Sequence, residues 1–231
     1  MNITHPDLYS VNHGFLDPEF RAAVTNGQWI LQDNGGDMEN DNQEFINLGI
    51  VDSIVTTHAD NIFSFKAFTE EFATKMLEET LNCGVVWERN PDEDEYRSMP
   101  EIRLREMDQR LFDVYKHFVL DWFSFVTEDY WKIHSNMLAD AQIAKYDPTN
   151  QKHGNWHHDA SSDITFVMPL STGFEGGGTE FLNQKIKIPP LPLGHVLCFP
   201  GRVTHLHRGM AVTKGDRFIL TAWTKIIGGD Y

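Results

Sequence analysis

Apolar residues recur along this chain at two different spacings, and the change between them falls near Met137. Before that point, two segments repeat apolar positions every three or four residues, as one face of an α-helix does. After it, short runs of β-branched and aromatic residues are separated by Gly, Pro and polar turns, the pattern of β-strands. The pattern therefore predicts supporting helices in the first part of the chain and a β-structure in the second.

The first predicted helix begins after Thr69, which can cap its N-terminus, and stops at Gly84. Its apolar face contains Phe72, Met76, Leu77 and Leu81. A longer second helix is predicted over residues 108–126. Its apolar positions are Leu111, Val114, Tyr115, Phe118, Trp122 and Phe125. These two amphipathic faces predict helices that pack against a sheet.

The other parts of the first half have weaker patterns. Residues 6–11 and 26–32 are compatible with short strands, and residues 33–43 form a polar, turn-rich loop. Residues 90–101 are predicted to be an exposed acidic loop. Residues 101–105 alternate as an edge strand does. We therefore expect residues 1–136 to supply N-terminal strands and supporting helices.

Seven β-rich runs follow, separated by turns, and predict an antiparallel barrel or jelly roll. They span residues 141–147, 156–160, 163–170, 178–186, 194–201, 204–209 and 216–226. The expected fold class is mainly β with flanking α-helices, around a double-stranded β-helix core of the jelly-roll or cupin-like kind. We expect residues 1–231 to form a single domain, with this core and the active site in residues 137–231.

Composition limits the classes of partner. The chain has 34 acidic and 19 basic residues, a formal charge of -15, and no basic cluster interleaved with aromatics, so we expect no nucleic-acid partner. The acidic surplus permits a basic substrate, although good solubility explains it equally simply. Cys83 and Cys198 form no Cys-x-x-Cys unit and are predicted to be buried thiols.

The N-terminus lacks a basic start followed by an apolar run, and no stretch approaches about 18 uninterrupted apolar residues. We therefore expect a soluble, cytoplasmic protein with no membrane partner.

The segment Asn-Trp-His-His-Asp at residues 155–159 is the first candidate for chemistry. On an extended strand, His157 and Asp159 share a side while His158 points away. A second cluster contains His205 and His207, and one of these can complete a ligand set. Two imidazoles and one carboxylate are typical of non-heme Fe(II) oxygenases, because they leave metal positions open.

Arg217 lies ten residues after His207, at the start of a predicted strand. An arginine inside a β-barrel is costly unless it pairs with an anion, and its planar guanidinium suits a carboxylate. The Gly176–Gly178 run is better explained by a tight turn than by phosphate binding, because no Lys-Ser or Lys-Thr at a helix start follows it.

Several segments together resemble the Fe(II) and 2-oxoglutarate-dependent dioxygenases, most closely the catalytic domain of the procollagen lysyl hydroxylases. The segments that carry the likeness are residues 145–161, 174–181, 200–209 and 215–223, with 68–79 and 100–118 upstream. The likeness covers roughly residues 60 to 226. It implies His157, Asp159 and His207 as iron ligands and Arg217 as the partner of the distal carboxylate of 2-oxoglutarate.

The resemblance also implies two further contacts to the cosubstrate. Tyr146, eleven residues before His157, matches a tyrosine that hydrogen-bonds 2-oxoglutarate in such enzymes. Thr179 lies where related prolyl hydroxylases have a threonine at the same carboxylate and lysyl hydroxylases have a cysteine. His158 and His205 are better interpreted as supporting or surface groups.

The implied cofactors are Fe(II), 2-oxoglutarate as cosubstrate and ascorbate as reductant, with O2 consumed. Arginine rather than lysine at position 217 favours a peptidyl lysine as substrate. The alternatives are a prolyl or free amino-acid hydroxylase, and a non-catalytic, cupin-like metal-binding protein. The expected partner is a peptide or protein that bears lysine, or a small amino acid, and the family makes a homodimer the first expectation.

Overall fold

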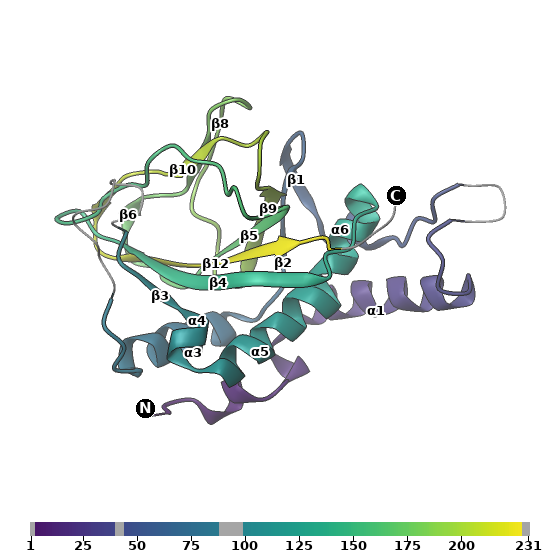
Figure 1. Ribbon diagram of the computed structural model, residues 1–231, viewed down its shortest axis with the longest axis horizontal. Helices are drawn as coiled ribbons and strands as arrows, with labels where there is room; N and C mark the ends of the chain where they lie inside the picture. The colour runs from purple at the N-terminus through teal and green to yellow at the C-terminus, as the bar shows by residue number, and fades with distance from the viewer. Residues whose placement is uncertain (1–2, 40–43, 88–98, 228–231) are drawn as a thin grey trace.

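A seven-stranded antiparallel sheet is the centre of the structure, a computed structural model that describes residues 3–39, 44–87 and 99–227 (Figure 1). The strand order is β1-β2-β9-β5-β12-β4-β3. Its strands are β1 (Thr56–Ala59), β2 (Ile62–Lys66), β3 (Glu101–Arg103), β4 (Met137–Tyr146), β5 (Ile164–Pro169), β9 (His195–Pro200) and β12 (Arg217–Lys225). Strand β12 is paired on both sides, by β4 and by β5.

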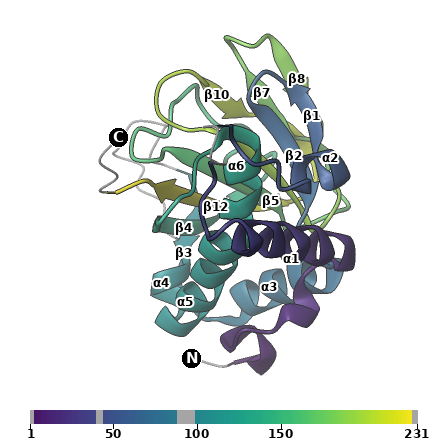
Figure 2. The same cartoon turned by 90° about the vertical axis from the view of Figure 1, so that its right-hand side faces the viewer.

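Shorter strands form a second layer over one face of this sheet. They are β6 (Glu175–Gly176), β7 (Thr179–Phe181), β8 (Ile186–Ile188), β10 (His207–Gly209) and β11 (Val212–Lys214). Strands β10, β7 and β8 make one sheet, and β11 pairs with β6. Figure 2 shows β7, β8 and β10 on the side away from the helices. All pairings among the described strands are antiparallel, as the jelly-roll prediction requires.

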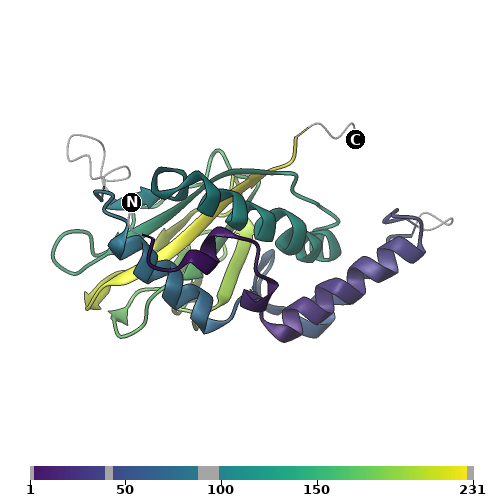
Figure 3. The same cartoon turned by 90° about the horizontal axis from the view of Figure 1, so that it is seen from below.

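Helices cover the other face of the large sheet, as Figure 3 shows from below. The α-helices are α1 (Pro18–Asp33), α2 (Ile50–Ile54), α3 (Glu70–Asn82), α4 (Leu104–Met107), α5 (Gln109–Phe118) and α6 (Ser124–Trp131). The π-helical turn η3 (Val119–Phe123) joins α5 to α6, and η1 (Pro6–Tyr9) and η2 (His13–Phe15) are 3-10 turns. The helices predicted from Thr69 and Asp108 are confirmed, and both residues cap their helices through side-chain oxygens.

The core between the helices and the sheet is strongly aromatic. Phe68 stacks on Phe72 of α3 at 4.0 Å between ring centroids, and Phe123 of η3 packs edge-on to Phe65 of β2 at 5.6 Å. All four rings are buried. Such pairs add to the hydrophobic contribution of the buried area, so the helices hold the large sheet firmly from behind.

Three sequence predictions are corrected by the structure. Residues 6–11 and 26–32 are not strands: the first segment contains η1, and the second lies inside α1, whose N-terminus is capped by Asp17. Of residues 101–105, only β3 is extended, because the chain turns into α4 at Leu104. Residues 156–160 are irregular, with a single β-bridge at His157. Pattern alone missed these cases because short amphipathic segments fit either period.

Other predictions have mixed outcomes. Cys83 and Cys198 are buried free thiols, as expected. Of the acidic loop predicted at residues 90–101, residues 90–98 lie outside the described residues. Within the described ranges, no helix combines the length and apolar character that crossing a membrane requires.

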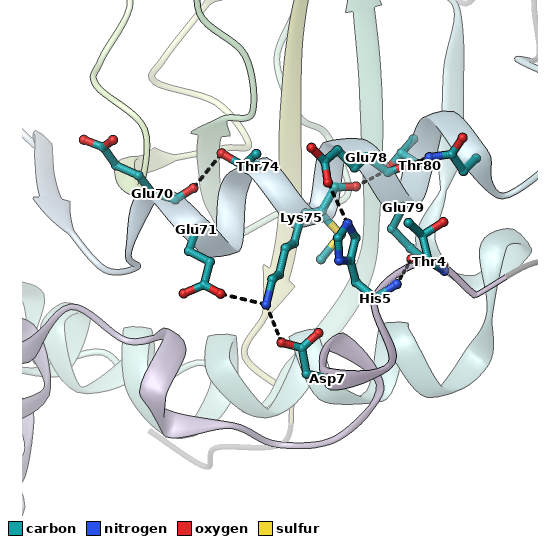
Figure 4. A network of polar contacts seen from close by, with 12 residues as sticks. Thr4, His5, Asp7, Glu70, Glu71, Thr74, Lys75, Glu78, Glu79 and Thr80 are labelled. Atoms are coloured by element: carbon teal, nitrogen blue, oxygen red, sulfur yellow. Dashed lines mark hydrogen bonds and ion pairs between the residues drawn. The ribbon is translucent and has the colours of Figure 1, made fainter.

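A buried carboxylate ties the N-terminal segment to α3 (Figure 4). Glu79 accepts hydrogen bonds from the backbone N–H groups of Thr4 and His5, at 2.9 and 2.7 Å, and from the Tyr9 hydroxyl at 2.7 Å. Those bonds satisfy a charge that is fully buried. Burial raises the pKa of Tyr9 well above its ordinary value, and the hydrogen bond to Glu79 raises it further.

We expect Glu79→Gln to lower the free energy of unfolding by about 2 kcal/mol, because an amide replaces a buried charged acceptor of three hydrogen bonds. Urea denaturation followed by circular dichroism measures this change. Glu78→Gln is the matched control. The Glu78 side chain is 53% exposed, and we expect its replacement to change the free energy of unfolding by no more than about 0.5 kcal/mol. Equal stability of both variants would contradict the anchoring role.

Candidate active site

A cavity of about 970 Å³ opens between the large sheet and the shorter strands. Its walls include inward-facing residues of β4, β5, β7, β10 and β12. His157, Asp159, His207, Tyr146, Arg217 and Thr179, the six residues predicted from sequence, all line it. The fold therefore brings together every predicted site residue.

Two reciprocal backbone hydrogen bonds hold His157 opposite His207. The N–H of each residue donates to the carbonyl of the other, both at 2.9 Å, in an isolated antiparallel bridge. Residues paired in this way project their side chains to the same side. The two imidazole rings accordingly lie 4.3 Å apart, centroid to centroid.

Asp159 completes the group. Its backbone N–H donates to the Gly201 carbonyl at 3.0 Å, which places its carboxylate beside both rings. The Nε2 atoms of His157 and His207 each lie 3.7 Å from a different Asp159 oxygen. One ligand atom from each of the three residues lies within 4.8 Å of the others, so this group could hold a metal ion.

The two rings are oriented in the same way, with Nε2 toward Asp159 and Nδ1 toward a backbone carbonyl. Nδ1 of His157 lies 2.7 Å from the Asn155 carbonyl, and Nδ1 of His207 lies 2.9 Å from the His205 carbonyl. A carbonyl only accepts, so these contacts assign the proton to Nδ1 and the lone pair to Nε2. Burial lowers the pKa of His207, which favours the neutral imidazole that a metal requires.

Thr165 supports the carboxylate and was not found from the sequence. Its hydroxyl donates to Asp159 Oδ2 at 2.7 Å, and the residue is fully buried on β5. This contact fixes the carboxylate plane, as residues behind metal ligands generally do. A threonine in a strand carries no distinctive signal, so the sequence could not have indicated this role.

His158 and His205, the other two histidines of the sequence motifs, lie outside the three-residue group. His205 is buried, with Nδ1 2.7 Å from the Thr204 hydroxyl and Nε2 3.5 Å from the Asp60 carbonyl. His158 has a buried Nε2 without a hydrogen-bond partner among the described residues. Burial lowers the pKa of His205. Neither histidine is among the residues that line the cavity.

Arg217 and Tyr146 form the opposite end of the cavity. They are direct cross-strand partners on β12 and β4, and the guanidinium carbon lies 4.9 Å from the Tyr146 ring centroid. Arg217 is 4% exposed, and within the described chain its Nε and Nη1 have no partner. Burial lowers the pKa of Arg217, but an arginine stays charged. A buried cation with free donors fits an anionic ligand such as a carboxylate.

Two glycines make room for these side chains. A Cβ on Gly209 would lie 2.6 Å from the Tyr146 hydroxyl, and one on Gly177 would lie 2.9 Å from the Arg217 Cδ. Gly177 also has a φ of +74°, which other residues adopt at a cost. Thr179 lies on β7, buried and paired with Gly209, at the same end of the cavity.

Residues 141–225 match the profile of the 2OG-Fe(II) oxygenase superfamily. The multifunctional procollagen lysine hydroxylase and glycosyltransferase of Caenorhabditis elegans is 26% identical over 238 residues, covering 91% of this chain and 31% of that protein. Human procollagen-lysine,2-oxoglutarate 5-dioxygenase 1 is 30% identical over 183 residues, covering 74% of this chain and 24% of that protein. This chain therefore spans about a quarter to a third of these curated relatives.

Solved structures with the same fold include two prolyl hydroxylases. The viral collagen prolyl hydroxylase of Paramecium Bursaria Chlorella virus-1 superposes with a TM-score of 0.54 at 19% identity, covering 72% of this chain and 97% of that one. The prolyl hydroxylase of Trichoplax adhaerens, solved with a hypoxia inducible factor peptide fragment, gives 0.61 at 10% identity, covering 92% and 95%. The predicted fold, mainly β with flanking helices around a double-stranded β-helix, is confirmed.

We expect His157→Ala to lose bound Fe(II), because it removes one of three ligand atoms, and His158→Ala to retain it. Iron content after anaerobic loading and desalting, measured by mass spectrometry, tests both variants. The assignment is reversed if the His158 variant loses iron while the His157 variant keeps it.

We expect Thr165→Val to weaken Fe(II) affinity by about 10- to 100-fold, because the isosteric side chain no longer orients Asp159. Anaerobic titration measures the affinity, and thermal denaturation of the metal-free protein checks the fold. An unchanged affinity would show that the backbone alone positions the carboxylate.

Proposed function

We propose that this chain, which carries a 2OG-Fe(II) oxygenase domain over residues 141–225, uses Fe(II), 2-oxoglutarate and O2 to hydroxylate a peptidyl lysine. One observation carries the proposal: a group of two histidines and one aspartate shares a cavity with a buried arginine whose Nε and Nη1 have no partner among the described residues. The three-residue group alone, or the buried arginine alone, would be weaker grounds for a catalytic site. Together they supply a site for a metal and a site for the far end of a dicarboxylate.

The donor set fits iron. His157, Asp159 and His207 would bind Fe(II) through two neutral imidazoles and one carboxylate, which leaves metal positions open. When bound, iron with 2-oxoglutarate and O2 would supply the oxidising power to replace an unactivated C–H bond by C–OH; one oxygen atom of O2 goes to the product and the other to succinate, with carbon dioxide released. The protein supplies orientation, through the His157–His207 bridge and the Thr165 contact.

The cosubstrate contacts follow from the other end of the cavity. Arg217 would bind the distal carboxylate of 2-oxoglutarate through its unpaired Nε and Nη1 donors. The Tyr146 hydroxyl and Thr179 lie at the same end and would add hydrogen bonds. This use of a buried cation also argues against the non-catalytic alternative, because simple metal storage needs no carboxylate partner.

Three lines support lysine as the substrate. The curated relatives named above are procollagen lysine hydroxylases, and their similarity extends over most of this chain. Position 217 carries arginine, which the sequence likeness associates with the lysyl branch. The acidic surplus of the chain is compatible with a cationic substrate. The second candidate is proline, because structures with this fold include prolyl hydroxylases.

The proposal includes a peptide or protein partner that bears the lysine. It also includes ascorbate, which would return oxidised iron to Fe(II) after unproductive turnovers. A homodimer remains the expected assembly, and size-exclusion chromatography with light scattering tests it.

The defining experiment incubates the chain with Fe(II), 2-oxoglutarate, ascorbate, and peptides that contain Lys-Gly or are rich in proline. Tandem mass spectrometry then locates the added oxygen, and succinate is measured in parallel. We expect one added oxygen on lysine. Addition on proline alone would overturn the lysine assignment, and absence of succinate with every peptide would overturn the enzymatic proposal.

We expect Arg217→Lys to weaken the apparent affinity for 2-oxoglutarate by about 10- to 100-fold, because the charge remains while the planar pair of donors is lost. Iron binding should stay nearly unchanged, since Arg217 is no part of the metal group. Succinate formation against 2-oxoglutarate concentration measures the effect. A normal cosubstrate dependence would remove the proposed role.

A further inference from the structure

The register of four adjacent strands, β5, β12, β4 and β3, maps the cavity wall into rows. Thr221 of β12 lies between Val167 of β5 and Gln142 of β4, and Gln142 is opposite Arg103 of β3. The next row contains Thr165, Trp223 and Asp140. All of these residues line the cavity. One end of the wall therefore holds Arg217 and Tyr146. The other end carries Thr165, which supports Asp159, and beside it a polar surface formed by Thr221, Gln142, Trp223 and Asp140.

Polar groups on that surface lack partners. Thr221 is 9% exposed, and its hydroxyl makes no hydrogen bond with the described residues. Trp223 has a buried Nε1 that is also without a partner there. The Thr221 hydroxyl faces the cavity and can accept a hydrogen bond from a ligand, whereas the Trp223 N–H only donates and would stay unpaired beside an ammonium.

Asp140 adds a negative charge to the same surface. Its carboxylate accepts from Arg103 Nη1 at 2.6 Å, and Arg105 Nε lies 3.7 Å away. Both arginine side chains are nearly half exposed. A guanidinium exposed to that extent contributes little stability through such a pair, so an incoming cation can replace it at small cost.

The position of Asp140 suits a substrate that reaches the metal. Asp140 is two strands away from Thr165, whose hydroxyl binds Asp159, and two strand spacings amount to about 10 Å. In lysine, Cδ lies about 2.5 Å from the ammonium nitrogen, a distance fixed by two covalent bonds. An ammonium at Asp140 would thus place its neighbouring carbons in the same cavity as the metal group.

From these observations we infer that Thr221, Gln142 and Asp140 form a subsite for the terminal ammonium of the substrate, with Arg103 as the group that the ammonium displaces. An ammonium has three donors and no acceptor. The hydroxyl, amide and carboxylate oxygens of the subsite are three acceptors on adjacent positions of β12 and β4. This inference rests on the proposed lysine hydroxylation and names the residues that select lysine.

The test compares a lysine peptide with the same peptide containing norleucine, which has the same carbon chain and no ammonium. We expect the intact chain to oxidise lysine in strong preference. In Asp140→Asn, the ratio of kcat/KM for lysine over norleucine should fall by about 10-fold or more, mainly through KM, because a charge-assisted bond is lost. Succinate formation without peptide should persist, which a general loss of structure would not allow.

Arg103→Gln separates the inference from its main alternative. If Arg103 only occupies the subsite, its removal lowers the KM for the lysine peptide. If Arg103 instead binds the peptide, KM rises and the inference is overturned. Asp113→Asn, on the exposed side of α5, is the control for loss of one negative charge.

The two proposals fail in different ways. Oxidation of proline, with lysine untouched in the intact chain, would refute the substrate and the subsite together. Lysine oxidation with an unchanged lysine preference in Asp140→Asn would refute the subsite alone.

Discussion

The pair of reciprocal backbone hydrogen bonds between His157 and His207 is the interaction on which the site depends. It joins an irregular segment to β10, and each residue donates to and accepts from the other. These hydrogen bonds use only backbone atoms, so the two rings gain a fixed position with both Nε2 atoms beside Asp159. The contacts of Asp159 with Gly201 and Thr165 then complete the group.

The large sheet separates two environments. Its helix-facing side is packed with phenylalanines, and its other side lines the cavity with polar and charged residues. Dense packing on one side resists movement. This rigidity can hold a buried guanidinium at Arg217, two of whose nitrogens have no partner in the described part of the chain. The cost of that burial is offset when a carboxylate binds. Stability supplied by the helices thus supports a site that is unfavourable by itself.

Strand β12 connects the chemistry with substrate selection. It begins at Arg217, continues through Thr221 to Trp223, and is hydrogen-bonded on both sides. Residues two apart on a strand face the same way, so one strand presents the cosubstrate site and the proposed ammonium subsite along a single cavity wall. Their separation is set by backbone geometry.

Much of this arrangement was accessible from the sequence. Periodicity predicted the helices after Thr69 and Asp108 and the antiparallel β-region, because apolar spacing reflects which face is buried. The six site residues came from motif spacing and family likeness, and they do converge. The short N-terminal segments were misjudged, because a few residues cannot distinguish a helix from a strand.

The tertiary structure decided what local pattern could not. The side chains of His157 and Asp159 do lie together, but not because they share one face of a strand, as the sequence pattern predicts. A bridge at His157 and a loop contact at Asp159 bring them together. The support from Thr165, the space left by Gly209, and the alignment of Thr221 with Gln142 depend on the register between strands distant in sequence. Register follows from the simultaneous packing of the whole sheet, and no single segment encodes it.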